Sequence, residues 1–140
     1  MLEDGDKGVI IQRDKTTYAV APHIPCGVVS PETLRRLADV AEKYQAAALK
    51  LTSAARIAIV GLREEDIDAV WADLGMEPGA GVGLCVRSVK ACPGTTFCKR
   101  GMQDSLGVGM KLDETFHGME LPSKLKIGVV TQAMMPFFVA

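Results

Sequence analysis

The chain has 140 residues and a net charge of −1, from 16 basic and 17 acidic side chains. This near-balance argues against general nucleic-acid binding, which needs a basic surplus. The length allows one domain or slightly more, with a real hydrophobic core. Residues 1–8 are acidic and lack the apolar core of a signal peptide, and no apolar run is long enough to span a membrane. We therefore expect a cytoplasmic protein with reduced cysteines.

The first predicted strand covers residues 17–24, where β-branched, aromatic and small apolar residues follow one another. Pro25-Cys26-Gly27 ends it. Ser30-Pro31-Glu32 predicts the start of a helix, because the hydroxyl can cap the helix, proline fits its first position and an acid favours its positive end. The residues at helical spacing that we expect to face the core are Leu34, Leu37, Ala38 and Ala41.

Two strands are predicted next, at 46–51 and 56–60, followed by a second helix at 64–74 that Gly75 caps. The expected inner face of that helix consists of Ile67, Val70, Trp71 and Leu74. A further strand at 84–89 completes the order strand, helix, strand, strand, helix, strand. This order predicts an α+β fold of the ferredoxin-like (split βαβ) type, with two helices on one face of an antiparallel sheet.

A cysteine loop follows, with the sequence Cys92-Pro-Gly-Thr-Thr-Phe-Cys98. A short loop of this composition can turn both sulfurs toward one point, and such thiolates bind zinc or an iron–sulfur cluster. Beyond it we expect a helix at 97–106 that is broken by Gly107 and Gly109, a strand at 125–130 and an apolar tail at 131–140. Lys124 and Lys126 are two residues apart, so on a strand they would point to the same side and could face an anion.

These stretches resemble the siroheme-dependent nitrite and sulfite reductases. The resemblance runs from about Tyr18 to Val129, and its most specific part is the cysteine loop with Leu121-Pro-Ser-Lys-Leu-Lys-Ile-Gly128. It implies a ferredoxin-like half-domain at 1–90 and, at 91–140, the start of a siroheme and 4Fe–4S domain. It also implies a six-electron reduction of nitrite or sulfite, in which electrons pass through the cluster to the siroheme iron that binds the anion.

The resemblance also implies roles for single residues. Cys92 and Cys98 are similar to the first two of four cluster thiolates. Lys124 and Lys126 are similar to the lysines that face the bound oxyanion, and Arg87 to an arginine of the family's active site. A basic site of this kind neutralises an anionic substrate and donates hydrogen bonds as oxygens leave.

The chain departs from the family pattern after the lysine pair. The family's second cysteine pair would fall near Val130, where the sequence reads Val130-Thr-Gln-Ala-Met-Met135, and its second repeat has no counterpart. His23 falls near another arginine of the family's anion site, and Cys26 replaces a glycine. We therefore expect a truncated part of a reductase that is inactive alone and binds neither siroheme nor an intact cluster.

Other interpretations of the residues stay open. The chain could be a non-enzymatic module that binds a partner or self-associates. It could also be a degenerate cluster or zinc carrier, in which Cys26 and Cys85, or His23, join Cys92 and Cys98. The apolar tail favours a homo-oligomer with residues 125–139 at or near the contact. The basic site suits nitrite and sulfite equally, and the electron donor stays unknown.

Overall fold

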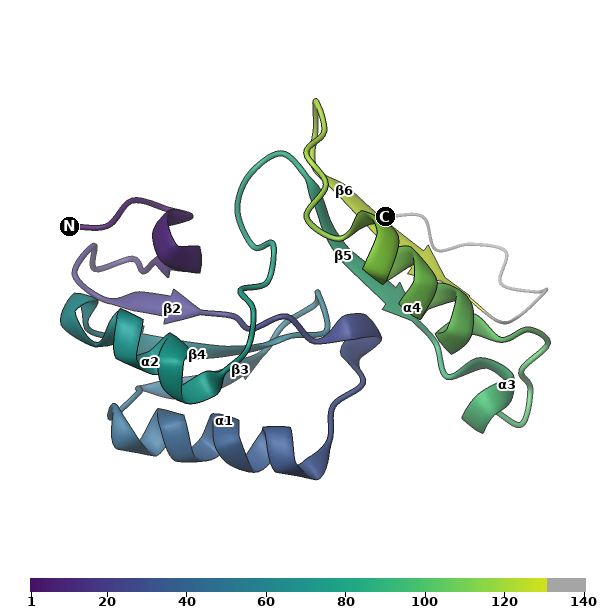
Figure 1. Cartoon of the computed structure of the whole chain (residues 1–140), viewed down its shortest axis with the longest axis horizontal. Helices are drawn as coiled ribbons and strands as arrows, with labels where there is room; N and C mark the ends of the chain where they lie inside the picture. The colour runs from purple at the N-terminus through teal and green to yellow at the C-terminus, as the bar shows by residue number, and fades with distance from the viewer. Residues whose placement is uncertain (131–140) are drawn as a thin grey trace.

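The computed structural model describes residues 1–130, which form two small sheets and the helices that cover them (Figure 1). The strands are β1 (Val9–Ile11), β2 (Tyr18–Val20), β3 (Ala48–Leu51), β4 (Ile57–Leu62), β5 (Val86–Ala91) and β6 (Leu125–Val129). The helices are α1 (Pro31–Lys43), α2 (Ile67–Leu74), α3 (Gly94–Phe97) and α4 (Ser105–Phe116), with short 3-10 turns at Asp6–Gly8, Pro25–Gly27 and Glu64–Asp66. The apolar tail at 131–140, and with it most of the self-contact predicted at 125–139, lies outside the described residues.

The first sheet is antiparallel and has the strand order β1-β2-β4-β3. The helices α1 and α2 pack against it and share one hydrophobic core with its strands (Figure 1). The most completely enclosed side chains of this core are Val9, Tyr18, Val20, Leu37, Ile59, Leu62, Ile67, Val70 and Leu74. Each large aliphatic side chain contributes roughly 1.5–3 kcal/mol on burial. The predicted α+β, ferredoxin-like arrangement is confirmed for this part of the chain.

The fourth strand of this sheet differs from the prediction. We expected it at 84–89, but β5 pairs in parallel with β6 in a separate two-stranded sheet. After α2 the chain runs beside the end of β2 only briefly, where the Gly79 N–H donates to the Ala21 carbonyl (2.9 Å). The strand β1, which the sequence analysis missed, pairs along β2 instead. A local pattern identifies a strand, but contacts that are distant in sequence choose its partner.

The second sheet has its own core, because α4 covers the β5–β6 pair. The apolar side chains that meet there include Val86, Val89, Leu106, Met110 and Ile127. Gly109 lets α4 approach closely: a methyl group at this position would lie 2.7 Å from the Ala91 Cβ and 2.8 Å from the Cys26 Sγ. We call the first sheet with α1 and α2 the first unit, and the β5–β6 pair with α4 the second unit. The close packing at Gly109 joins the turn at Pro25–Gly27, which belongs to the first unit, to the second unit.

The helix predicted at 97–106 is wrong in its position. Helix α3 ends at Phe97, and α4 begins at Ser105 and continues through both glycines that we expected to interrupt it. The Asp104 carboxylate caps α4 by accepting a hydrogen bond from the Gly107 N–H (3.0 Å). A glycine inside a helix costs about 1 kcal/mol relative to alanine. The cap and the close approach at Gly109 offset that cost.

The inner faces of α1 and α2 are largely as predicted. Leu37, Ala41, Ile67, Val70 and Leu74 are buried. Leu34, in contrast, is 44% exposed, because it lies one turn before the part of α1 that meets the core. Trp71 is half-buried at the margin of the core, where its indole N–H donates to the Lys7 carbonyl (2.8 Å).

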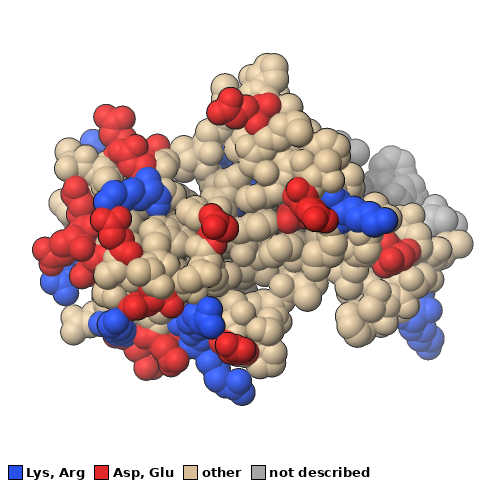
Figure 2. Space-filling view, in the orientation of Figure 1, with Lys and Arg blue, Asp and Glu red and all other residues tan. Residues whose placement is uncertain are grey.

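Charged side chains of both signs lie on the face of the molecule that is visible in Figure 2. Acidic and basic side chains are intermixed there rather than gathered into one basic surface. Within residues 1–130, no helix combines the length and the hydropathy that crossing a bilayer requires.

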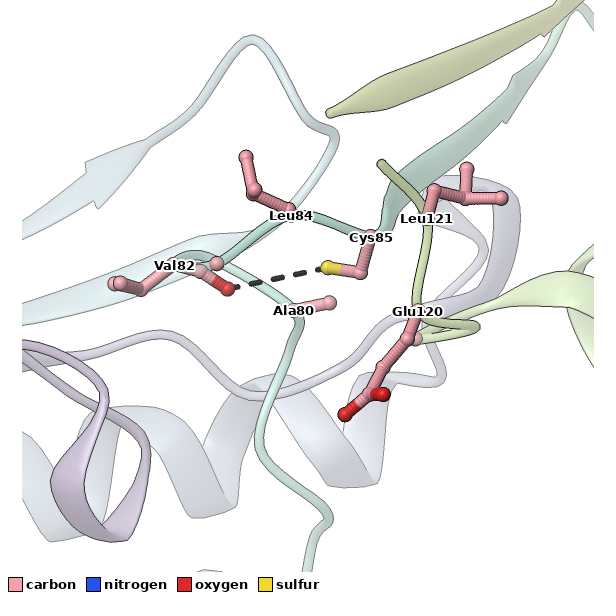
Figure 3. Close-up of a pocket in the computed structure, with 8 residues that line it drawn as sticks. Ala80, Val82, Leu84, Cys85, Glu120 and Leu121 are labelled. Carbon is pink, nitrogen blue, oxygen red and sulfur yellow. Dashed lines mark hydrogen bonds between the residues drawn. The ribbon is translucent and has the colours of Figure 1, made fainter. Parts of the chain in front are cut away.

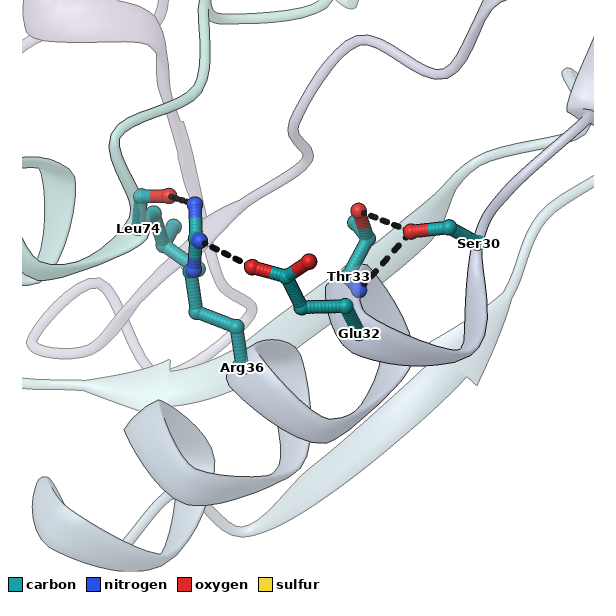
Figure 4. A network of polar contacts seen from close by, with 5 residues as sticks. All are labelled: Ser30, Glu32, Thr33, Arg36 and Leu74. Carbon is teal, nitrogen blue, oxygen red and sulfur yellow. Dashed lines mark hydrogen bonds and ion pairs between the residues drawn. The ribbon is translucent and has the colours of Figure 1, made fainter.

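The start of α1 confirms the predicted cap (Figure 4). The Ser30 Oγ accepts a hydrogen bond from the Thr33 N–H at 3.1 Å. One turn later, the Arg36 guanidinium reaches the Glu32 carboxylate (3.2 Å) and donates to the Leu74 carbonyl (3.2 Å). The first turns of α1 are therefore tied both to their own N-terminus and to the end of α2.

Replacing Ser30 by alanine is expected to lower the free energy of unfolding by about 0.5–2 kcal/mol, because an N–H of the first turn loses its acceptor. Urea denaturation monitored by circular dichroism measures this loss. The variant Ser30→Asp keeps an acceptor and serves as the control, with an expected change of a few tenths of a kcal/mol. Equal losses in both variants would show that the hydroxyl does not act as a cap.

Candidate functional site

The cysteine loop begins where β5 ends. The Cys92 N–H donates to the Val129 carbonyl (3.0 Å), so the first cysteine continues the β5–β6 ladder. Gly94 then turns the chain with a φ of +61°, and the Cys98 N–H donates to the Gly94 carbonyl (2.8 Å). Both cysteines are half-buried. The structure thus holds the two predicted thiolates in one hydrogen-bonded loop at the end of the small sheet.

The three predicted oxyanion-binding cations lie on or beside the same two strands. Lys126 is on β6, where its backbone pairs with that of Ser88 on β5. Lys124 precedes β6, and both lysines are exposed. Arg87 is on β5, and its guanidinium donates to the Gly83 carbonyl from Nε (3.1 Å) and from Nη2 (2.9 Å). The parallel pairing of β5 and β6 therefore brings residues from distant parts of the sequence to neighbouring positions.

A recess beside Arg87 gathers polar residues that the sequence analysis did not bring together. Its lining consists of His23, Ile24, Ala54, Arg56, Arg87, Ser88, Val89 and Asp113. Arg56, Ser88 and Asp113 are only 7%, 4% and 5% exposed. In the described part of the chain, Arg56 Nη1, Ser88 Oγ and Asp113 Oδ1 have no hydrogen-bond partner. Buried polar atoms of this kind usually have a partner, but the recess is too narrow to admit a water molecule, so these three atoms stay unsatisfied within the described residues.

The charged side chains that line this recess shift the pKa of Arg56. Burial lowers the pKa of Arg56, and the positive charge of Arg87 lowers it further. The Asp113 carboxylate partly offsets this effect and is itself held by the His23 Nε2 at 2.7 Å. Two arginines and one carboxylate that is already paired therefore line the recess, and the local charge is positive.

Two family models match consecutive parts of the chain. Residues 10–77 match the nitrite/sulfite reductase ferredoxin-like half domain, and residues 82–136 match the nitrite and sulphite reductase 4Fe-4S domain. The chain belongs to the nitrite and sulfite reductase family. The first region contains the sheet with α1 and α2, and the second contains β5, the cysteine loop, α4 and β6. The domain division at residue 90 stays a prediction.

Relatives within this family are much longer than the matched region. An assimilatory-type sulfite reductase of Nitratidesulfovibrio vulgaris is 43% identical over 128 residues, which cover 91% of this chain and 59% of the relative. An NAD(P)H nitrite reductase of Bacillus subtilis is 41% identical over 119 residues, 85% of this chain and 15% of the relative. The crystal structure of dissimilatory sulfite reductase I superposes with a TM-score of 0.70 at 17% identity, over 82% of this chain and 28% of that one, and shows the same fold.

Members of the family depend on siroheme and a 4Fe–4S cluster. A cluster held only by cysteines takes four thiolates, and the cysteine loop contains two cysteines. The other two cysteines of the sequence are buried at other places: Cys26 lies against α4, and Cys85 immediately precedes β5. Within residues 1–130, no three Cys, His, Asp or Glu side chains are grouped so that they could hold a metal ion. The described residues therefore do not form a complete cluster site.

Proposed function

We propose that this chain provides half of the cluster thiolates and the basic oxyanion-binding residues of a nitrite or sulfite reductase. The observation that carries the proposal is that a cysteine of the loop and two of the basic residues lie on, or directly continue, the same pair of strands, β5 and β6. Cys92 extends the ladder of that pair, and Arg87 and Lys126 lie within it. Substrate-binding cations and cluster ligands would thus be fixed relative to one another by a single small sheet.

Each group has a separate chemical task in this proposal. A guanidinium and two ammonium groups neutralise a small oxyanion and donate hydrogen bonds to its oxygens. These hydrogen bonds strengthen as negative charge develops on the oxygens. Siroheme and the cluster, when bound, would pass electrons from an external donor to the oxyanion. Because the cysteine loop provides two thiolates, we propose that the others come from residues beyond this sequence, and that the chain alone is inactive.

A chimera tests this proposal. In the assimilatory-type sulfite reductase that is 43% identical, the matching segment is replaced by residues of this chain. We expect the chimera to bind iron and siroheme and to reduce sulfite or nitrite with a reduced dye. The isolated chain is expected to be colourless, as judged by iron and sulfide content and by the visible spectrum.

Variants of the chimera separate the roles. Cys92→Ser is expected to abolish cluster content, whereas Cys85→Ala, at a buried cysteine outside the loop, should retain it. Lys126→Ala should keep the spectrum and raise the KM for the oxyanion. A chimera that binds both cofactors equally well with and without Cys92 would refute the proposal. It would favour the alternative that the chain is a non-enzymatic module.

A further inference from the structure

Two histidines join three separate chain segments at the junction of the two units. His23 follows β2, and His117 caps the end of α4. Their rings are stacked, with centroids 3.6 Å apart and planes at 18°. The His23 Nε2 lies 2.7 Å from the Asp113 Oδ2, and the Ala80 N–H, in the loop between α2 and β5, donates to the His117 Nε2 (3.4 Å). The stacked pair therefore fastens that loop to α4.

The two hydrogen bonds respond differently to a proton. The His23 Nε2 donates its N–H to a carboxylate, and it can do so whether the ring is neutral or charged. The His117 Nε2 accepts a hydrogen bond, so it must carry a lone pair and the ring proton must be on Nδ1. Protonation of His117 converts this acceptor into a donor that faces the Ala80 N–H. The hydrogen bond between His23 and Asp113 therefore persists when His23 is protonated. The hydrogen bond from the Ala80 N–H to His117 is lost when His117 is protonated.

The surroundings of His117 resist its protonation. Burial lowers the pKa of His117, the neighbouring His23 lowers it further, and Arg56, immediately before β4, adds a smaller effect in the same direction. Only Asp113 acts in the opposite sense. Of the remaining nearby groups, Glu114 lines the open hollow on this side of the ring, and burial raises the pKa of the Cys26 thiol, which is therefore neutral.

The loop that begins at Ala80 leads directly to Arg87. Its Gly83 carbonyl accepts both hydrogen bonds of the Arg87 guanidinium. Figure 3 shows the loop residues Ala80, Val82 and Leu84 on one side of a hollow, with Glu120 and Leu121 on the other. The hollow has a volume of about 490 Å³. The loop thus has open space beside it, and its Gly83 carbonyl is the hydrogen-bond partner of the Arg87 guanidinium.

We propose that His117 is a pH-sensitive fastener: in its neutral form it holds the loop at 80–84 against α4, and on protonation it releases the loop and with it the guanidinium of Arg87. This inference concerns the folded chain itself and does not require bound siroheme or a cluster. If Arg87 binds an oxyanion, as proposed above, the fastener makes that binding weaker in acid.

The direction of the effect follows from proton binding. An unfastened histidine titrates near its ordinary pKa of about 6.5. Because the fastened form of His117 has a lower pKa, the released loop binds more protons below that pH. The fastened state is therefore favoured at neutral pH and is lost as the pH falls, by at most about tenfold in the equilibrium for each pH unit.

Nuclear magnetic resonance of the full, isotopically labelled chain tests the fastener between pH 8 and pH 5. The chain has only two histidines, so both ring signals can be assigned. We expect the Ala80 amide and the Arg87 Nε–H to shift with the same midpoint as the His117 ring. Hydrogen exchange at Ala80, corrected for its intrinsic rate, should accelerate in parallel.

The variant His117→Gln keeps a side-chain acceptor but does not titrate. In it, the Ala80 and Arg87 signals should become independent of pH over this range. Glu114→Gln removes a nearby carboxylate that makes no hydrogen bond to His117, and the coupled shifts should persist. Ala80 and Arg87 signals that do not follow the His117 ring in the native chain would overturn the inference, and this comparison stands even if a variant fails to fold.

Discussion

Leu37→Ala is expected to lower the free energy of unfolding by about 2–5 kcal/mol, the usual cost of deleting a buried leucine side chain. Leu37 is 1% exposed and lies in the core that α1, α2 and the first sheet share. Truncation leaves a cavity between the helix and the sheet that the neighbours can fill only in part. Urea denaturation followed by tryptophan fluorescence measures the loss, because the single Trp71 lies at the margin of the same core.

Leu34→Ala is the matched control, since it makes the same truncation in the same helix one turn earlier. Leu34 is 44% exposed, so we expect a change within about 0.5 kcal/mol. The difference between the two variants isolates burial from helix propensity. A loss at Leu34 as large as that at Leu37 would show that the first turn of α1 is covered and that the sequence-based inner face, which included Leu34, was right.

Local signals in the sequence were enough to predict most of the first unit. The helix start at Ser30 and the left-handed cap at Gly75 are encoded within a few residues, and both are confirmed. The inner face of α2 follows from helical spacing for the same reason. These features depend on the backbone of one segment, so they need no knowledge of its partners.

Pairing between distant segments was harder to predict. The strand near residues 84–89 was recognised, but its partner β6 is more than thirty residues away, and nothing in its local pattern excludes the first sheet. The short strand β1 was missed, although Val9, Ile10 and Ile11 form an apolar run before a turn. Three residues carry too little periodicity to separate a strand from a loop.

In the candidate site, too, the local features were predictable and the features that depend on distant segments were not. The cysteine loop and the lysine pair are recognisable because their spacing is local. The buried cluster of Arg56, Ser88 and Asp113 comes from the residue before β4, from β5 and from α4, and it forms only where the two units meet. One signal was available: Asp113 follows Leu106 and Met110 on the apolar face of α4, and an acid in that position indicates a buried polar contact. The predicted helix at 97–106 ended before Asp113, so the sequence analysis did not recognise this signal.

The cysteine loop itself depends on one glycine. Gly94 is buried and has a φ of +61°, a conformation that other residues rarely adopt. A methyl group at this position would lie 2.6 Å from the Ser105 backbone nitrogen and 2.7 Å from the Gln103 carbonyl oxygen. The same carbonyl accepts the hydrogen bond from the Thr95 N–H (3.0 Å) that closes the loop. Rigid backbone surrounds Gly94, so the loop must move to admit a side chain.

Gly94→Ala is therefore expected to lower the free energy of unfolding by roughly 2–5 kcal/mol, because left-handed strain and overpacking act together. Gly118→Ala is the control: Gly118 also has a positive φ (+76°), but a methyl group there meets nothing within 4 Å. It should show the strain alone, roughly 1–2 kcal/mol. Alkylation of Cys98 should accelerate only in Gly94→Ala, since the Cys98 N–H bonds to the Gly94 carbonyl. Equal stability losses and equal thiol reactivity in the two variants would show that backbone conformation, and not the close contact with residues 103–105, makes glycine necessary in the loop.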